Sequence, residues 1–117
     1  MSFKFRLILD PPRPVMLNMA IDEMLMETQA ESNAVPTLRF YSWICPAYTI
    51  GYFQNTVEIT KRLQSAKTGI PVARRITGGG LVFHGNDVTF SITAKGSSPF
   101  FSGEVIPTYA SACVLGL

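Results

Sequence analysis

Residues 74–84, with the sequence RRITGGGLVFH, hold the side chains of this chain that are best suited to binding chemistry. Arginine guanidinium groups donate forked hydrogen bonds to phosphate or carboxylate oxygens, and successive glycine N–H groups can cradle the same anions. Three adjacent glycines also cost more backbone entropy on folding than other residues would. The stretch therefore predicts a loop that binds an anionic group, most simply an adenylate phosphate. The alternative is a glycine-rich hairpin whose arginines only decorate the surface.

The other polar residues indicate no second reaction centre. The chain has no GxGxxG opening a helix and no GxxxxGK[ST], so neither common nucleotide-binding motif is present. His84 is the sole histidine, so no metal site is expected, and we expect it to make a loop hydrogen bond rather than to be oriented by Asp87. Asp22 and Glu23 are adjacent on a predicted helix, where they point about 100° apart and form no carboxylate pair.

Short strands and helices must position the glycine stretch. The patterns predict strands over 3–9, 37–43, 47–54, 71–77, 81–84 and 87–95, and helices over 14–32, 56–69 and 106–117. In the first helix, the apolar residues at helical spacing, expected to pack, are Leu17, Ala20, Ile21, Met24 and Leu25, together with Met16, Met19 and Met26. Tyr41 and Trp43 are expected in the sheet core, and Gly69 is the expected end of the second helix.

Composition restricts the class of protein. Hydrophobic residues make up 47% and charged residues 15%, which excludes intrinsic disorder. A net charge of +2 gives no argument for nucleic acid, and no apolar run is long enough to predict a membrane span. The N-terminus lacks a secretory signal, and Cys45 and Cys113 have no CxxC or metal spacing. We therefore expect a cytoplasmic protein in which both cysteines are small packed residues.

Charge and the last segment give two further expectations. The five basic residues of one interval without acids are Lys61, Arg62, Lys67, Arg74 and Arg75, which form either a solvated face or a rim for an anionic ligand or acidic partner. The predicted last helix ends on Val114, Leu115 and Leu117, an apolar set that must pack. Residues 1–117 are therefore predicted to be part of a larger α/β domain, unless this helix docks on the sheet.

The stretch RRITGGGLVFHGNDVTFSI resembles the signature of the biotin/lipoate A/B protein ligase family, particularly lipoate–protein ligases and their octanoyltransferase relatives. NMAIDEMLM is similar to the family's first helix, and FYSWICPAYTIGYFQN to its strand pair. The resemblance implies an α/β (α+β) fold with a mainly antiparallel central sheet and flanking helices, like class II synthetases and biotin ligases. Residues 1–117 would be the N-terminal portion of one catalytic domain, and the fold would be incomplete.

The resemblance also implies a site. Arg75 would contact an acyl-adenylate phosphate, the glycines would line the acyl chain and nucleotide, and His84 would help to set the loop. The implied binding residues are Arg75, Thr77, Gly78, Gly79, Gly80, Leu81, Val82, Phe83 and His84, and the implied pocket border is Tyr52, Gln54, Asn55, Asn86 and Thr89.

Two departures bear on the branch and on catalysis. Gly85-Asn86-Asp87 after the histidine is nearer the octanoyltransferase-like branch, whereas Gly80 stands where that branch often has arginine. The family's essential lysine and the transferase branch's nucleophilic cysteine lie further along. Lys95 does not match that lysine motif, so the catalytic residue is expected beyond residue 117.

By resemblance, the function is attachment of a lipoyl or octanoyl group to a lysine. Lipoate or octanoate is activated with ATP and Mg²⁺, or the acyl group is taken from a carrier. The implied partners are small acidic lipoyl domains of 2-oxoacid dehydrogenase complexes or the glycine cleavage H protein, and acyl carrier protein. A truncated, catalytically silent acyl- or nucleotide-binding module is the alternative, and biotin–protein ligase is a third.

Overall fold

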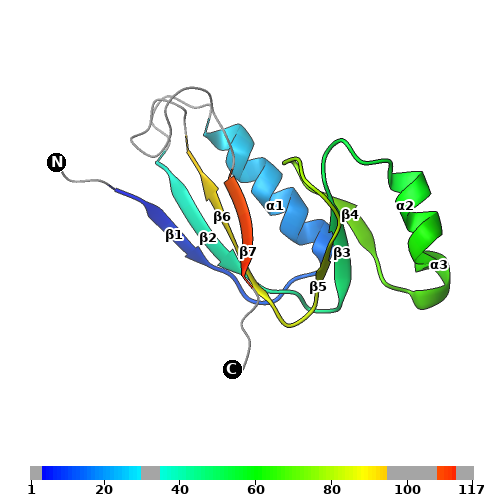
Figure 1. Ribbon diagram of the computed structural model, residues 1–117. Helices are drawn as coiled ribbons and strands as arrows, with labels where there is room; N and C mark the ends of the chain where they lie inside the picture. Colours follow the sequence, from blue (N-terminus) through cyan, green and yellow to red (C-terminus); the bar gives the residue numbers. More distant parts are fainter. Residues whose placement is uncertain (1–3, 30–34, 95–107, 113–117) are drawn as a thin grey trace.

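The computed structural model describes residues 4–29, 35–94 and 108–112, which form two β-sheets beside one long helix (Figure 1). The four-stranded sheet has the order β1-β2-β6-β7, with the bounds Arg6–Leu9, Thr37–Tyr41, Val88–Thr93 and Thr108–Ala112. The three-stranded sheet has the order β4-β3-β5, with the bounds Val72–Arg74, Ala47–Ile50 and Val82–His84. The glycine stretch connects β4 to β5.

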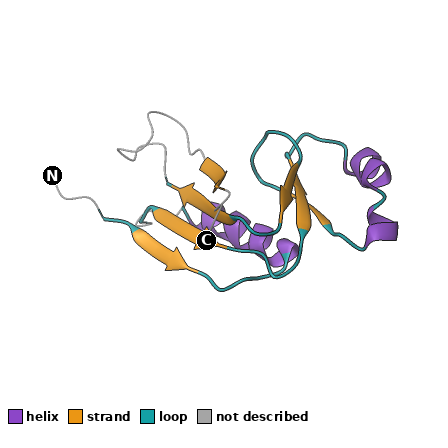
Figure 2. Cartoon of the chain, turned by 60° about the horizontal axis from the view of Figure 1, so that its bottom comes forward, coloured by secondary structure: helices purple, strands orange, loops and turns teal. Residues whose placement is uncertain are grey.

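The strand pairing is mixed. β2–β6, β6–β7 and β3–β5 are antiparallel, whereas β1–β2 and β3–β4 are parallel. The expected α/β class with mainly antiparallel pairing is thus confirmed, and the strands divide between two sheets rather than forming one. Figure 2 shows the sheets as separate groups of strands. The chain crosses from one to the other at residues 42–46 and 85–87.

Three helices accompany the sheets in the described part of the chain. α1 (Val15–Thr28) packs against β6 of the larger sheet and against β3 and β4 of the smaller one. α2 (Thr56–Leu63) and α3 (Ser65–Thr68) lie beyond the smaller sheet, at the end of the molecule farthest from β1 (Figures 1 and 2). None of the described helices is long and apolar enough to cross a membrane.

The predicted last helix is wrong where the structure describes it. Residues Thr108–Ala112 form β7, which pairs with β6 from Ile92↔Thr108 to Val88↔Ala112. Threonine and tyrosine favour strands, and β6 offers an edge whose backbone groups gain partners from β7. Long-range pairing therefore overrides the local helical pattern. Cys113, Val114, Leu115 and Leu117 lie outside the described residues.

The predicted helix over 56–69 is two helices. Gln64 takes a left-handed conformation with φ of 53°, which ends α2 and begins α3. This conformation is uncommon for a residue with a side chain, and it interrupts the helical path between α2 and α3. Gly69, with φ of 71°, ends α3, as the sequence predicted.

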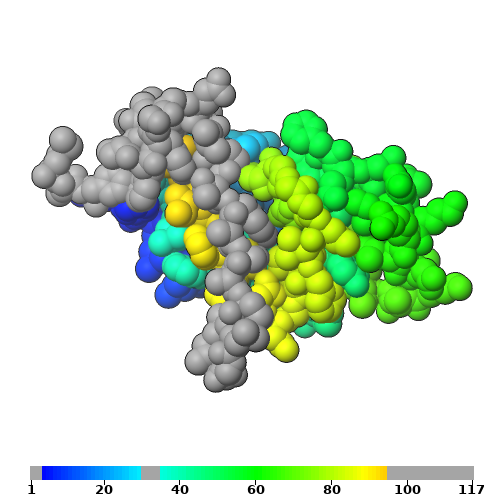
Figure 3. Space-filling view, viewed as in Figure 1, coloured from blue at the N-terminus to red at the C-terminus, as the bar shows by residue number. Residues whose placement is uncertain are grey.

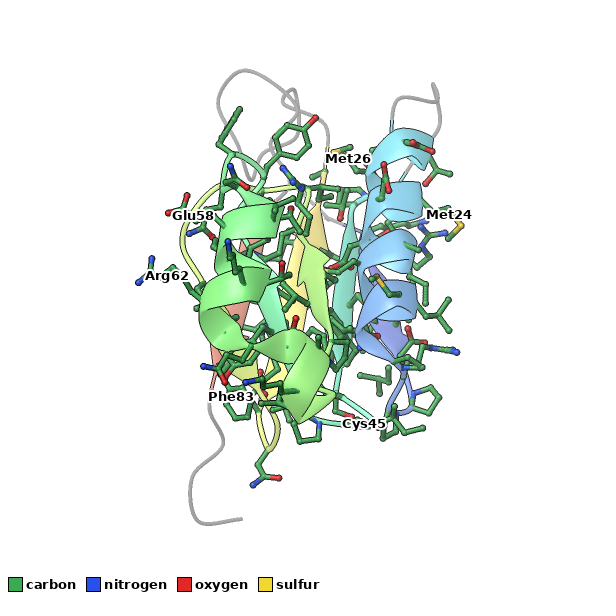
Figure 4. All side chains as sticks on the ribbon, turned by 90° about the vertical axis from the view of Figure 1, so that its right-hand side faces the viewer. Met24, Met26, Cys45, Glu58, Arg62 and Phe83 are labelled. Atoms are coloured by element: carbon green, nitrogen blue, oxygen red, sulfur yellow. The ribbon has the colours of Figure 1, made fainter. Side chains whose placement is uncertain are left out.

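The buried face of α1 differs from the predicted one. Its buried residues are Val15, Asn18, Met19, Asp22 and Leu25, so of the five residues predicted from apolar spacing only Leu25 is buried. Met16 and Met24 are 62% and 51% exposed, and Figure 4 shows Met24 on the outer side of the helix. Glu23 is exposed, which confirms that it and Asp22 point apart.

A buried polar network explains this orientation of α1. Arg39 on β2 is fully buried; its Nε donates to Asp10 Oδ2 at 2.8 Å and its Nη1 to Asp22 Oδ1 at 2.9 Å. Its Nη2 donates to Asn18 Oδ1 at 2.8 Å. Tyr41 donates its hydroxyl to Asp22 Oδ2, also at 2.8 Å. The helix thus faces the larger sheet through hydrogen-bonded polar groups, which burial makes costly to leave unpaired.

The apolar core adjoins this network on the same buried face of α1. Its members are Val15, Met19, Tyr41, Trp43, Ala47 and Ala73, which come from the helix, from β2 and the segment after it, and from the smaller sheet. The predicted core positions of Tyr41 and Trp43 are therefore confirmed. Cys45, predicted to be packed, is instead exposed in the connection before β3.

Candidate functional site

The glycine stretch is held against the end of β3. A Cβ atom built on Gly51 would lie 2.0 Å from the carbonyl oxygen of Gly79, so only glycine fits there. The amide of Tyr52 donates to the carbonyl of Thr77 at 2.9 Å, beside this contact. Gly79 itself has φ of 105°, which disfavours any side chain. The fold thus requires glycine at positions 51 and 79.

The other two glycines of the stretch are not required by the fold. Gly78 and Gly80 lack a positive φ, and a Cβ atom at either would meet no atom within 4 Å. Both residues are exposed. Their missing side chains leave bare backbone at the surface, which is how glycine admits a closely bound ligand.

Arg75 organises this loop from beneath. Its Nη2 donates to the carbonyls of Gly80 at 2.7 Å and Gly78 at 3.2 Å, and its Nη1 donates to Thr49 Oγ1 at 2.9 Å. Arg75 is 5% exposed. Two loop carbonyls are thereby drawn toward the guanidinium, whose positive charge lies directly under the exposed backbone. The direct phosphate contact implied for Arg75 stays a prediction.

Gln54 and Asn55 shape the segment that leads from β3 to α2. The side-chain oxygen of Gln54 accepts from the Gly51 amide at 2.8 Å, and the amide of Gln54 donates to the Gly51 carbonyl at 3.1 Å. Asn55 is the N-cap of α2, where its Oδ1 accepts from the Glu58 amide at 3.1 Å. Gln54 thus fixes the Gly51 backbone that faces Gly79, and Asn55 fixes the start of α2.

Asp87 orients His84, contrary to the prediction of a loop bond alone. His84 is fully buried; its Nδ1 lies 2.7 Å from Asp87 Oδ2, and its Nε2 lies 2.8 Å from Thr49 Oγ1. Trp43 stacks on the imidazole with ring centroids 4.0 Å apart. Burial lowers the pKa of His84, and the nearby positive charge of Arg75 lowers it further. Together they outweigh the contact with Asp87, which would raise this pKa. The histidine is therefore neutral near pH 7.

The carboxylate of Asp87 is surrounded by donors. Oδ1 accepts from the Gly85 amide at 2.8 Å, and Oδ2 accepts from Trp43 Nε1 at 3.2 Å and Thr89 Oγ1 at 3.0 Å. Burial alone would raise the pKa of Asp87, but the contact with His84 and the Gly85 amide hold it below its usual value. Asp87 is ionised at neutral pH.

The remaining predicted site residues fall into two groups. Leu81 and Tyr52 are exposed near the loop, Val82 is half-buried on β5, and the Thr77 carbonyl accepts from the Tyr52 amide. Phe83 is exposed toward the end of the molecule where Cys45 lies (Figure 4). Asn86, in contrast, lies in the turn at the opposite end of β5 from the glycines. Thr89 is fully buried beside Asp87. The structure therefore does not bring Asn86 and Thr89 to the glycine loop.

A cavity of about 350 Å³ adjoins the loop and is lined by Gln54, Ile59, Arg62, Leu63 and Leu81. In Figure 3 the loop and β5 form the surface next to α2, and Figure 4 shows Arg62 projecting from α2 on the same side as Glu58. Lys61, Lys67 and Arg74 are also exposed, while Arg74 donates to the Tyr52 carbonyl at 2.6 Å and to Thr56. Of the five basic residues only Arg62 lines this cavity, so the choice between a solvated face and a rim for an anionic ligand stays open.

Sequence reasoning missed Thr49 as part of the site and assigned no reason to Gly51. Thr49 gives no signal, because threonine is common in strands, whereas the glycine before YFQN interrupts a strand pattern. Within the described ranges, no three His, Cys, Asp or Glu side chains form a group that could hold a metal ion.

The family model of the lipoyl protein ligase A/B catalytic domain matches residues 14–108 of this chain. Octanoyltransferase LipM of Carboxydothermus hydrogenoformans is 39% identical over 103 residues, and that of Moorella thermoacetica is 40% identical over 104 residues. Each alignment covers 86% of this chain and 38% of the relative. The chain thus spans well under half the length of these relatives.

Solved structures give the same result. A Thermoplasma acidophilum protein solved with bound lipoic acid has a TM-score of 0.63 at 34% identity. The match covers 80% of this chain and 38% of that protein's chain. The bi-partite lipoate protein ligase of Thermoplasma acidophilum, described with its E2 lipoyl domain, has a TM-score of 0.63 at 32% identity. That match covers 80% of this chain and 36% of the ligase chain. A lipoate-protein ligase A bound with ATP has a TM-score of 0.57 at 32% identity, covering 80% of this chain and 37% of its own.

Proposed function

Because this chain belongs to the lipoyl protein ligase A/B catalytic domain family, we propose that the protein attaches an octanoyl or lipoyl group to a lysine of a lipoyl domain. The observation that carries the proposal is the bare backbone of Gly78 and Gly80, which the fold itself does not require to be glycine. A bound acyl group and its activating phosphate or thioester would approach the backbone there. Arg75 supplies positive charge beneath the same loop.

We propose octanoyl transfer from a carrier as the specific reaction. The octanoyltransferases named above are 39% and 40% identical to this chain, against 32% for the lipoate ligases bound with ATP or described with a lipoyl domain. In the net reaction the acyl group passes from the carrier thioester, by way of the cysteine nucleophile expected beyond residue 117, to the lysine amine; an amide forms, and the carrier thiol leaves with the proton that the amine gives up. The glycine N–H groups would stabilise the negative charge that develops on the carbonyl oxygen.

ATP-dependent ligation is the second candidate. It is favoured by the buried guanidinium under a glycine loop, an arrangement suited to an adenylate phosphate, and by the similarity to a ligase solved with ATP. Among the described residues, no three His, Cys, Asp or Glu side chains lie close enough together to hold Mg²⁺. The ion would therefore enter as part of the nucleotide substrate, held by phosphate oxygens.

The proposed acceptor is a lipoyl domain, with acyl carrier protein as the octanoyl donor. Support comes from the solved lipoate ligase that is described with its E2 lipoyl domain. The exposed Lys61, Arg62 and Lys67 would attract an acidic partner toward α2 and α3, where Arg62 also lines the cavity. The glycine cleavage H protein is a second proposed acceptor of the same kind.

The test measures the mass of an unmodified lipoyl domain after incubation with the native-length protein. One reaction contains octanoyl-acyl carrier protein without nucleotide; the other contains octanoate, ATP and Mg²⁺. We expect the mass of one octanoyl group to be added in the first reaction. Addition only in the second would establish ligation instead. Binding of octanoyl groups without transfer in either reaction would favour a silent binding module, and transfer of biotin alone would favour a biotin ligase.

A further inference from the structure

Thr49 connects His84 to the arginine that holds the glycine loop. Thr49 and His84 lie on the same face of the β3–β5 ladder, where Ala47 pairs with His84 and Thr49 with Val82. The Thr49 hydroxyl lies 2.8 Å from His84 Nε2 and 2.9 Å from Arg75 Nη1. Thr49 and His84 are fully buried. One hydroxyl therefore touches both groups.

The direction of each hydrogen bond in this series is determined by its ends. Asp87 is an ionised acceptor, so the proton of neutral His84 lies on Nδ1. The lone pair of His84 Nε2 must then accept the hydroxyl proton of Thr49. The oxygen of Thr49 accepts from Arg75, because a guanidinium can only donate. Thr49 thus donates once and accepts once.

A second consequence concerns the charged groups around the imidazole. Those that face His84 among the described residues are Asp87, from the turn after β5, and Arg75, from the end of β4. A proton added to Nε2 would turn toward the Thr49 oxygen, where Arg75 already donates. The hydroxyl proton would lose its acceptor, and a second positive charge would be buried near the guanidinium.

We propose that Thr49 is a positioning residue that transmits the protonation state of His84 to Arg75 and thereby to the glycine loop. This inference rests on the proposed function for its biological meaning, because the loop is the proposed acyl-binding surface. The relay itself is a property of the described contacts. At neutral pH it holds the Gly78 and Gly80 carbonyls on Arg75, and acid releases them.

The relay is tested by NMR on the 117-residue chain, which has one histidine, so its imidazole signals are unambiguous. We expect ¹⁵N shifts typical of an Nδ1–H imidazole and a titration midpoint below 6.5. The amide signals of Gly79 and Gly80 should titrate with that same midpoint. Glycine amides that do not follow the imidazole would overturn the proposal in the unsubstituted protein, whatever any variant does.

Two substitutions separate positioning from packing. Thr49→Val keeps the shape but removes the hydroxyl, so the glycine amides should no longer follow His84, whereas the Nδ1–H tautomer, which Asp87 determines, should persist. Thr49→Ser should restore the coupling between His84 and the glycine amides. Thr60→Val is the matched control, because that hydroxyl donates only to the Val57 carbonyl of its own helix. Coupling that survives Thr49→Val, or that Thr60→Val abolishes equally, would overturn the proposal.

Binding of a non-hydrolysable octanoyl-adenylate analogue gives the functional readout. Loss of a contact to a charged partner should weaken binding of the analogue by about tenfold in Thr49→Val at pH 7, with recovery in Thr49→Ser. Equal affinity in Thr49→Val and the parent would contradict the positioning role. If the parent does not bind the analogue while the amides still titrate with His84, the adenylate site is refuted and the relay is supported.

Discussion

Gly51→Ala would test directly how the glycine loop is held. The added Cβ would lie 2.0 Å from the Gly79 carbonyl oxygen and 2.8 Å from the carbonyl carbon, whereas real Cβ contacts are essentially never below 3.0 Å. The two backbone segments must therefore separate by about 1 Å. That shift would lengthen the 2.9 Å bond from the Tyr52 amide to the Thr77 carbonyl beyond hydrogen-bond range.

The magnitude follows from these contacts. Overpacking of this kind costs about 1–3 kcal/mol, and loss of one backbone hydrogen bond costs about 1 kcal/mol. Alanine also restricts the unfolded chain more than glycine does, which offsets about 0.4–1 kcal/mol of this destabilisation. We expect the free energy of unfolding of Gly51→Ala to fall by about 2 kcal/mol. Binding of the octanoyl-adenylate analogue should weaken as well, because the loop itself is displaced.

The assay is urea unfolding followed by fluorescence of the single tryptophan, Trp43, which stacks on the buried His84. Gly78→Ala is the matched control, since its Cβ would meet nothing within 4 Å. Its free energy of unfolding should stay within about 0.5 kcal/mol of the parent. If Gly51→Ala and Gly78→Ala unfold at the same urea concentration, the close packing of Gly51 on Gly79 does not hold the loop.

Four further outcomes are expected. Arg75→Ala should weaken binding of the adenylate analogue by about ten- to a hundredfold, and Arg75→Lys should recover part of it; unchanged binding by a folded Arg75→Ala would remove the arginine from the site. The pKa of His84 is lowered in the folded state, so the unfolded chain takes up this proton first: the free energy of unfolding, measured in urea at a series of pH values, should fall as pH drops below 6.5, and should fall again below 3.8 as Asp87 is protonated. A flat profile across the upper range would contradict a lowered pKa of His84 in the folded state. Asn55→Ala should cost about 1 kcal/mol by removing the N-cap of α2, whereas Asn55→Asp should cost little; equal urea midpoints for the two would refute the cap. Residues 1–117 alone should transfer no octanoyl group to a lipoyl domain, by mass; transfer that Lys95→Ala abolishes would make Lys95 the missing catalytic group.

The sequence was sufficient to locate the glycine loop but not to explain it. Strands entering and leaving RRITGGGLVFH follow from local pattern, as does the family to which that motif points. Thr49 could not be found this way, because its partner His84 lies 35 residues away and threonine is an ordinary strand residue. Gly51 shows the same limit, since its requirement comes from the approach of Gly79 and from no neighbour in sequence.

Two helix predictions failed for related reasons. Apolar spacing selected the wrong face of α1, because the helix is oriented by Arg39 on β2, which bonds Asn18 and Asp22. Because Arg39 lies outside the helix in the sequence, the apolar periodicity of the helix does not reveal its effect. The segment over 106–117 reads as helical locally, yet Thr108–Ala112 pairs with β6. Pairing between distant strands decides secondary structure where local preference is weak.

The polar contact between α1 and the larger sheet has a calorimetric consequence. Unfolding hydrates Asn18, Asp22 and Arg39, and newly exposed polar surface lowers the heat capacity of unfolding by about 0.26 cal/mol/K per Å², while apolar surface raises it by about 0.45. Leu9 and Met16, already 72% and 62% exposed, contribute little to the increase. The heat capacity change per residue should therefore lie below the usual value of about 12–15 cal/mol/K. The stability of this fold should then vary more gradually with temperature than that of an equally long chain with an apolar interior.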